Sequence, residues 1–290
     1  MYKRIGYIIA VLYLSVNLSA QTYHGTRVHT WCNDIPISMY LPEDYFTSFQ
    51  YYPVLYLLHG TGENEESWFN SGNAEQIFDQ LIGNGNMRKM IVVMPYSSGE
   101  TDGAYENSFR DLMSFVERNF RTLKGKRFHA IAGLSLGGFY AMHISHRYYN
   151  KFDYVGLFSA IYTTDKKSIF KKERDALFGI TQTSPIIYKN TERDLARQNR
   201  IPPKLYFIAI GKRDFLYNQN VLFREYLTEK EYPFVYHETG GGHEWKNWQA
   251  YLMTFLPLLF NDLPNEIDAS YEELEEDVEE GHEVYLDVAN

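Results

Sequence analysis

Short runs of apolar residues recur along the chain, and stretches with helical spacing separate them. Five runs have the nearly continuous apolar composition of strands that are buried on both faces: residues 52–60, 90–97, 128–133, 154–160 and 205–211. Residues 234–240 follow as a predicted last strand. Near the N-terminus, residues 22–41 alternate polar and apolar positions, which predicts an antiparallel pair close to a sheet edge.

Apolar positions at helical spacing predict helices between these strands, at residues 73–85, 108–123, 137–149 and 246–260. Strands that alternate with helices of this length predict an α/β fold with a mainly parallel central sheet and helices on both faces. Residues 161–203 interrupt the alternation, because about forty residues separate two core strands there. We expect this insertion to form a cap over the carboxyl edge of the sheet.

The first twenty residues have the order of a secretory signal peptide. Lys3 and Arg4 precede a mostly apolar run that begins at Ile5, and Ser19 and Ala20 are small. The run is too short and wrongly flanked for a membrane-spanning helix. We expect cleavage after Ala20, a secreted or periplasmic domain over residues 21–261, and no membrane association after cleavage. With one cysteine in the sequence, no intrachain disulfide can form.

The net charge of −9 is concentrated at the C-terminus. Residues 262–290 contain 12 of the 37 acidic residues and no lysine or arginine, so the remainder is nearly neutral. We expect 262–290 to be a solvated acidic tail. Since no basic stripe is present, the sequence gives no support for nucleic-acid binding. Aromatic residues make up 17% of the chain, which is compatible with a surface that faces carbohydrate.

The segment "IAGLSLGG" at 131–138 places Ser135 between glycines, after a predicted buried strand and before a predicted helix. In this context the G-x-S-x-G pattern indicates a nucleophile elbow, a turn so tight that only glycine fits beside the serine. We therefore expect Ser135 to be a nucleophile. The amide of Leu136, at the start of the helix, is expected to face a developing oxyanion.

A serine nucleophile needs a base, and the base needs an orienting acid. In this type of fold, the acid and the histidine follow the serine in that order along the chain. Asp214 comes directly after the strand at 205–211, and Asp165 is the alternative acid. His243 follows three glycines after the last strand, and His237 is the alternative base. We assign the acid to Asp214 and the base to His243.

The loop "HGTGENEESW" after the first buried strand is expected to supply the second oxyanion amide. We expect Thr61 to donate it, with Gly62 as the alternative, while His59 is interpreted as a structural loop residue. His143 and His146 are three residues apart on one helix, but no third ligand accompanies them. We therefore interpret them as a solvated face and expect neither a metal nor an organic cofactor.

Together, "YLLHGTGENEESW", "AIAGLSLGGFYAMHIS", "GKRDFLY" and "GGHEWKNW" resemble segments of the putative-esterase family of α/β-hydrolases. That family includes secreted feruloyl and acetylxylan esterases and the related S-formylglutathione hydrolases. The resemblance covers roughly residues 24–260 and implies the same nucleophile, acid and base as the residue patterns. The chain departs from the more glycine-rich loop that the family often has after His-Gly.

The sequence therefore predicts a secreted serine esterase that acts on feruloyl or acetyl esters of plant polysaccharides or oligosaccharides through an acyl-enzyme. Three alternatives remain open, namely a thioester or S-formylglutathione hydrolase, an acyltransferase, and a non-catalytic binding protein on the same scaffold. Aromatic side chains of the insertion, Phe170, Phe178 and Tyr188, are expected to contact an aromatic acyl group. Trp245, close to the histidine, is a further candidate for substrate binding.

Overall fold

A computed structural model describes residues 23–97, 103–162 and 191–263. These residues form an eight-stranded sheet in the order β1-β2-β4-β3-β5-β6-β7-β8. The predicted N-terminal pair, β1 and β2, is antiparallel, and β2 also lies antiparallel to β4. The other neighbours are parallel. The strands are β1 Thr26–Cys32, β2 Ile35–Leu41, β3 Val54–Leu58, β4 Ile91–Pro95, β5 His129–Leu134, β6 Tyr154–Phe158, β7 Leu205–Gly211 and β8 Val235–Thr239.

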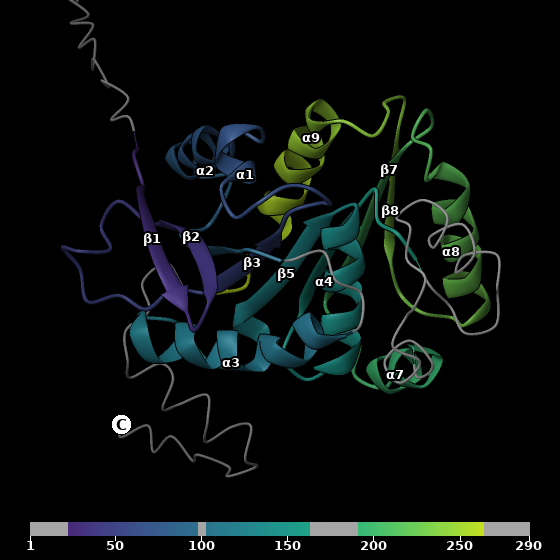
Figure 1. Cartoon of the computed structure of the whole chain (residues 1–290), viewed down its shortest axis with the longest axis horizontal. Coiled ribbons are helices and arrows are strands. Elements are labelled where there is room, and N and C mark those ends of the chain that lie inside the picture. The colour runs from purple at the N-terminus through teal and green to yellow at the C-terminus, as the bar shows by residue number, and fades with distance from the viewer. Residues whose placement is uncertain (1–22, 98–102, 163–190, 264–290) are drawn as a thin grey trace, which may run out of the picture.

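Helices cover both faces of the sheet, as predicted (Figure 1). One face carries α1 Ser67–Asn70, α2 Ala74–Gly83 and α9 Trp245–Phe255. The other carries α3 Ala104–Asn119, α4 Leu136–Arg147, α7 Thr191–Gln198 and α8 Tyr217–Glu229. Short 3-10 helices span Lys126–Phe128 and Leu256–Leu258. The sequence pattern did not predict α8. None of the helices within the described ranges combines the length and the apolar content that crossing a membrane requires.

The central strands are buried because each of their faces meets a separate hydrophobic core. Every residue of β3, β4, β5 and β6 is buried, which explains their continuous apolar runs. The parallel register pairs Leu58 with Gly133 and Leu134 with Phe158, so three central strands end side by side. The loops that follow β3, β5, β6, β7 and β8 therefore meet at one edge, where ligands bind in open α/β sheets.

The described part of the predicted insertion, residues 191–203, does not lie over that edge. Gln198 on α7 donates a hydrogen bond to the carbonyl of Ser145, near the far end of α4, at 3.0 Å. Lys126, just before β5, bonds the carbonyl of Ile201 at 2.8 Å. This segment consequently packs at the amino end of the sheet. The remainder of the predicted cap, the predicted signal peptide and most of the acidic tail lie outside the described residues.

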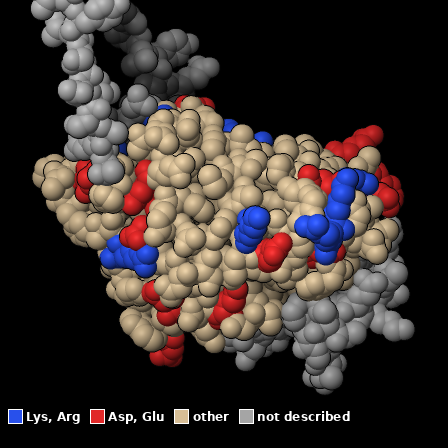
Figure 2. All heavy atoms as spheres, turned by 90° about the horizontal axis from the view of Figure 1, so that it is seen from above, with Lys and Arg blue, Asp and Glu red and all other residues tan. Residues whose placement is uncertain are grey.

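Asp262, the first residue assigned to the tail, belongs to the folded body. Its carboxylate accepts a hydrogen bond from Lys204 at 2.6 Å and one from the Tyr154 hydroxyl at 3.2 Å. On the side of the molecule seen in Figure 2, charged side chains of both signs are scattered over a mostly uncharged surface. Basic residues do not gather into a stripe on this face.

Candidate active site

Ser135 occupies a strained turn between β5 and α4, with φ 53° and ψ −115°. The glycines two residues before it and two residues after it have no room for a side chain. A Cβ on Gly133 would lie 2.4 Å from the Gly137 carbonyl, and one on Gly137 would lie 2.4 Å from the carbonyl oxygen of His59. The Ser135 amide donates to Phe158 at 2.8 Å, which fastens the turn to the end of β6. The predicted elbow is therefore set by close packing of backbone on backbone.

The structure brings the three predicted catalytic residues together. His243 Nε2 lies 3.0 Å from Ser135 Oγ, and His243 Nδ1 lies 2.9 Å from Asp214 Oδ2 and 3.1 Å from Oδ1. Since a carboxylate only accepts hydrogen bonds, the proton resides on Nδ1, and Nε2 accepts from the serine hydroxyl. This geometry allows His243 to take the Ser135 proton while Asp214 holds the ring in the required tautomer.

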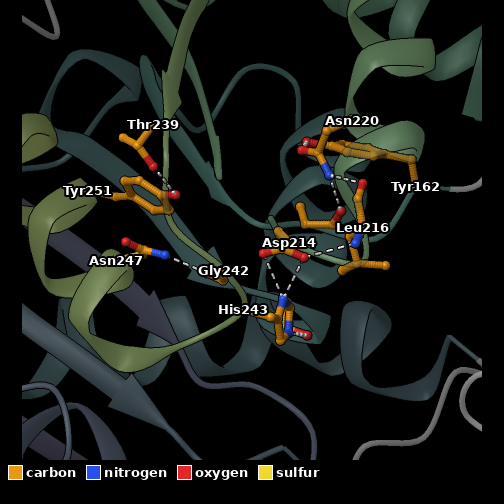
Figure 3. Close-up of polar contacts among 11 residues, drawn as sticks. Tyr162, Asp214, Leu216, Asn220, Thr239, Gly242, His243, Asn247 and Tyr251 are labelled. Carbon is orange, nitrogen blue, oxygen red and sulfur yellow. Dashed lines mark hydrogen bonds and ion pairs between the residues drawn. The ribbon is translucent and has the colours of Figure 1, made fainter. Parts of the chain in front are cut away.

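A buried network that the sequence analysis did not identify supports Asp214 (Figure 3). The Leu216 amide donates to Asp214 Oδ1 at 2.8 Å. Asn220 Nδ2 donates to the carbonyls of Leu216 and Ala160 at 3.0 and 3.1 Å, and its Oδ1 accepts from the Tyr162 hydroxyl at 3.1 Å. Asn220 thus ties the loop of the acid to the segment behind the elbow. It is fully buried.

The loop that carries His243 folds back over the sheet, as its glycines predict. A Cβ on Gly211 would lie 2.0 Å from the Gly241 carbonyl oxygen, so the ends of β7 and this loop touch through their backbones. The Arg213 amide donates to Gly241 at 2.9 Å, and the Asn247 side chain donates to the Gly242 carbonyl. These contacts place His243 one residue beyond a fixed backbone segment (Figure 3).

Aromatic rings surround the imidazole of His243. The Trp248 ring lies 4.9 Å away in an edge-on arrangement, and the Phe215 ring lies 4.4 Å away. Trp248 is buried, whereas Phe215 is 60% exposed beside the triad. Trp245, which the sequence singled out, is half-buried and packs edge-on against Trp248 and Trp68. Phe215 was not predicted, although it directly follows the predicted acid.

The loop after β3 forms a turn over Gly60, Thr61, Gly62 and Glu63. The Glu63 amide donates to the Gly60 carbonyl at 3.4 Å, and Gly62 has a φ of 75°. The Gly60 amide donates to Glu63 Oε2 at 2.8 Å. Thr61 and Gly62 are exposed, and within the described parts of the chain no hydrogen bond engages either amide. Both amides therefore stay available as oxyanion donors, and the choice between them stays a prediction.

His59 holds this turn in the structural role that the sequence suggested. Its Nδ1–H donates to the Gly60 carbonyl at 2.8 Å, and its Nε2 accepts from the Ser97 amide at 3.0 Å. Both bonds require the neutral imidazole, because Nε2 acts as an acceptor. Burial lowers the pKa of His59, which favours that neutral form.

The structure also shows the surroundings of His237, the alternative base, and of the pair His143 and His146. His237 lies in β8, where its ring stacks on Phe207, and it takes no part in the triad. His143 and His146 are buried, so the expected solvated face was wrong. The end of α4 packs against β7, and His146 Nε2 lies 3.1 Å from the Tyr206 hydroxyl.

The alternative acid Asp165 and the predicted substrate contacts Phe170 and Tyr188 lie outside the described residues. A group of three or more His, Cys, Asp or Glu side chains placed to hold a metal ion does not occur among the described residues.

Comparison with known proteins identifies the family of the chain. The family model described as "Putative esterase" matches residues 29–259. An endo-1,4-beta-xylanase/feruloyl esterase from Xylanibacter ruminicola is 42% identical over 119 residues, 37% of this chain and 16% of that protein. An esterase from Mycobacterium tuberculosis is 27% identical over 245 residues, 71% of this chain and 52% of that protein. The chain thus spans about half of these relatives or less.

Solved structures share the fold. A ferulic acid esterase superposes with a TM-score of 0.69 at 23% identity, over 81% of this chain and 97% of that chain. An S-formylglutathione hydrolase from Staphylococcus aureus gives 0.62 at 19% identity, over 81% and 97%. A feruloyl esterase module from Clostridium thermocellum, complexed with sinapinate, gives 0.65 at 21% identity, over 90% and 98%. The chain belongs to the putative-esterase family, and it has the fold of the esterases to which it is compared.

Proposed function

We propose that this protein is a secreted serine esterase that removes feruloyl groups, and less efficiently acetyl groups, from plant polysaccharides. The hydrogen-bonded series Ser135, His243 and Asp214 carries the proposal, because it is the arrangement that acyl transfer to a serine requires. The names of a xylanase/feruloyl esterase relative and of the ferulic acid esterase neighbour support the substrate class. Residues 1–20 support secretion.

In the proposed mechanism, His243 Nε2 takes the proton of the Ser135 hydroxyl as Oγ attacks the ester carbonyl. The C–O bond to the sugar then breaks, and His243 returns the proton to the leaving alcohol, which leaves an acyl group on Ser135. A water molecule then attacks the acyl group in the same way, with His243 as the base, and the free carboxylic acid is released. The amides of Leu136 and of Thr61 or Gly62 would stabilise the oxyanion of both tetrahedral intermediates.

The preference for an aromatic acyl group rests on two exposed aromatic rings, one beside the triad and one beside the loop after β3. Phe215 is 60% exposed with its ring 4.4 Å from His243, and Tyr96 is 37% exposed with its ring 5.8 Å from the His59 ring. A hydroxycinnamoyl group can gain about 0.5–1.5 kcal/mol per favourable ring contact, which an acetyl group cannot. The preference is tested by kcat/KM for methyl ferulate and methyl acetate in wild type and in Phe215→Ala.

We expect Phe215→Ala to lower kcat/KM for methyl ferulate about tenfold, and to change that for methyl acetate less than twofold. An equal loss on both esters would mean that Phe215 supports His243 and does not recognise the acyl group. A wild-type preference for acetate would favour the deacetylase activity.

The triad assignment is tested by substitution of each member. Ser135→Ala and His243→Ala should each lower kcat about 10⁴-fold or more, because the three residues act as one unit. Asp214→Asn should cost nearly as much, whereas Asp165→Asn should have little effect. The measurement is turnover of a small ester, with circular dichroism to show that the variants fold. A larger loss for Asp165→Asn than for Asp214→Asn would contradict the assignment of the acid.

A further inference from the structure

Glu63 places a carboxylate beside the proposed nucleophile, and the mechanism above does not use it. The position that a Cβ would take on Gly60 is 3.3 Å from Glu63 Oε2 and 3.5 Å from Ser135 Cβ. Both atoms therefore lie close to the same point beside Gly60, which brings the acidic group near the nucleophile. At this distance a charge is felt by the reacting ester.

The carboxylate of Glu63 is held in place by the turn to which it belongs. Its Oε2 accepts the Gly60 amide at 2.8 Å, and the Glu63 amide closes the turn on the Gly60 carbonyl. The side chain is half-buried. Burial raises the pKa of this carboxyl, and its effect outweighs the bonds from Gly60 and Trp245 and the proximity of His243, which favour the charged form.

This charge is not needed to form the turn itself. Gly62 supplies the positive φ that the turn requires, and His59 holds the Gly60 carbonyl from the other side. An amide oxygen in place of the carboxylate would accept the Gly60 N–H equally well. What the glutamate adds is a negative charge and oxygen lone pairs beside the reacting group. Carboxylate oxygens accept hydrogen bonds from hydroxyl groups and repel other anions.

We propose that Glu63 determines the charge specificity of the site: it accepts uncharged, hydroxyl-bearing esters and discriminates against esters that carry a carboxylate near the scissile bond. The inference rests on the proposed function, since it takes Ser135 as the reacting group and a neutral sugar as the preferred alcohol. The same charge specificity would disfavour glutathione thioesters as substrates, because glutathione carries carboxylates.

The test uses pairs of esters with nearly the same shape that differ in one charge. One pair consists of the acetyl esters of glycolic acid and of glycolamide, and the corresponding feruloyl esters form a second. A third pair places the charge in the acyl half: monoethyl malonate and the ethyl ester of malonamic acid. The quantity measured is the ratio of kcat/KM for the neutral to that for the anionic member, at low and at high salt.

We expect wild type to prefer the neutral member about tenfold for the alcohol-half pairs, for the acyl-half pair or for both. This ratio should be smaller at high salt. Glu63→Gln keeps an acceptor for Gly60 and removes the charge, so the ratio should fall to about 2 or less while turnover of the neutral ester changes less than threefold. Glu65→Gln, two residues along the same loop, is the matched control and should leave the ratio unchanged.

The inference would be overturned if the wild-type ratio were near one both for the alcohol-half pairs and for the acyl-half pair. It would also be overturned if the preference survived Glu63→Gln. If Glu63 only held the turn, Glu63→Ala would lower both rates equally and no variant would change the ratio, which also contradicts the inference. Because the acetyl pair contains no feruloyl group, it tests the charge specificity even if the proposed preference for feruloyl esters is wrong. Labelling rates with a neutral and an anionic fluorophosphonate give the same ratio without turnover.

Discussion

Two glycine-containing turns border the proposed active site, and they are built in opposite ways. At the elbow, a Cβ on Gly133 or Gly137 would meet backbone atoms at 2.4 Å, and Ser135 between them is buried. In the turn from Gly60 to Glu63, a Cβ on Gly62 would meet nothing within 4 Å, and both Thr61 and Gly62 are exposed. The first turn is crowded at both of these glycines, whereas the second faces open space at Gly62.

The difference separates what the fold dictates from what this chain can vary. The elbow is set by the approach of β5, α4 and the end of β3, so its glycines are requirements of packing. The other turn is closed by the Glu63 side chain and by His59, which are local choices of sequence. We infer that the position of the nucleophile comes from the scaffold, and that selectivity comes from the open turn.

Of the substitutions that test the comparison of the two turns, the largest loss of stability and of kcat is expected for Gly137→Ala at the crowded elbow. Gly137→Ala would place a methyl group 2.4 Å from the His59 carbonyl oxygen and 2.6 Å from that of Leu58. Because both atoms are backbone, α4 and the end of β3 must move apart, at a cost of about 3 kcal/mol. We expect kcat for a small ester to fall about 100-fold, with a matching loss in urea unfolding. A variant with wild-type stability and turnover would show that the elbow is not set by packing.

A smaller effect is expected from the network that joins the elbow to the acid. Asn220→Ala removes the donors to Leu216 and Ala160 and leaves the Tyr162 hydroxyl without its acceptor. We expect a loss of about 2 kcal/mol in stability and about tenfold in kcat, with little change in KM. Asn199→Ala, whose contact to Lys230 is 3.4 Å, is the control. Loss of stability without loss of kcat would limit Asn220 to a structural role.

The helix behind the elbow predicts a dependence of stability on pH. Burial lowers the pKa of His146 to about 3, so the folded protein keeps it neutral while the unfolded chain protonates it near 6.5. The unfolded state therefore binds more protons below pH 6.5, and stability falls as the pH drops from 6.5 toward 3, by up to about 1.4 kcal/mol per pH unit.

His146→Gln should remove this contribution and flatten the slope of unfolding free energy between pH 6 and pH 4. Equal slopes in wild type and His146→Gln would contradict the buried neutral state of His146.

The smallest effect is expected in the open turn. Gly62→Ala meets no steric obstacle, and its cost is limited to the strain of a φ of 75°, about 1 kcal/mol. We expect kcat to change less than threefold, in contrast to Gly137→Ala. A loss as large as that of Gly137→Ala would remove the distinction between the two turns.

Much of the fold could be predicted, because buried parallel strands leave continuous apolar runs and short motifs place their functional residues at strand ends. The runs at 128–133 and 205–211 became β5 and β7, and Ser135 and Asp214 follow them. Helix α8 was missed because two of its buried residues, Gln219 and Asn220, are polar, which weakens the apolar pattern of a helix.

Contacts between distant segments could not be predicted. The sequence shows His143 and His146 on one face of a helix, but whether that face meets solvent depends on the strand and helices packed against it. In the sequence, Glu63 is one of several acidic residues in a loop. Only the folded turn places it beside Ser135. A motif fixes a residue's place along an element, whereas tertiary packing decides what that residue touches.

The most direct test of the central claim, that Ser135 is a nucleophile activated by His243, is covalent labelling with a fluorophosphonate followed by mass spectrometry. We predict one adduct per chain, on the peptide that contains Ser135, in wild type. Ser135→Ala should carry no adduct, and His243→Ala should label at least about 100-fold more slowly. Undiminished labelling of Ser135→Ala, or equal rates in wild type and His243→Ala, would contradict the account.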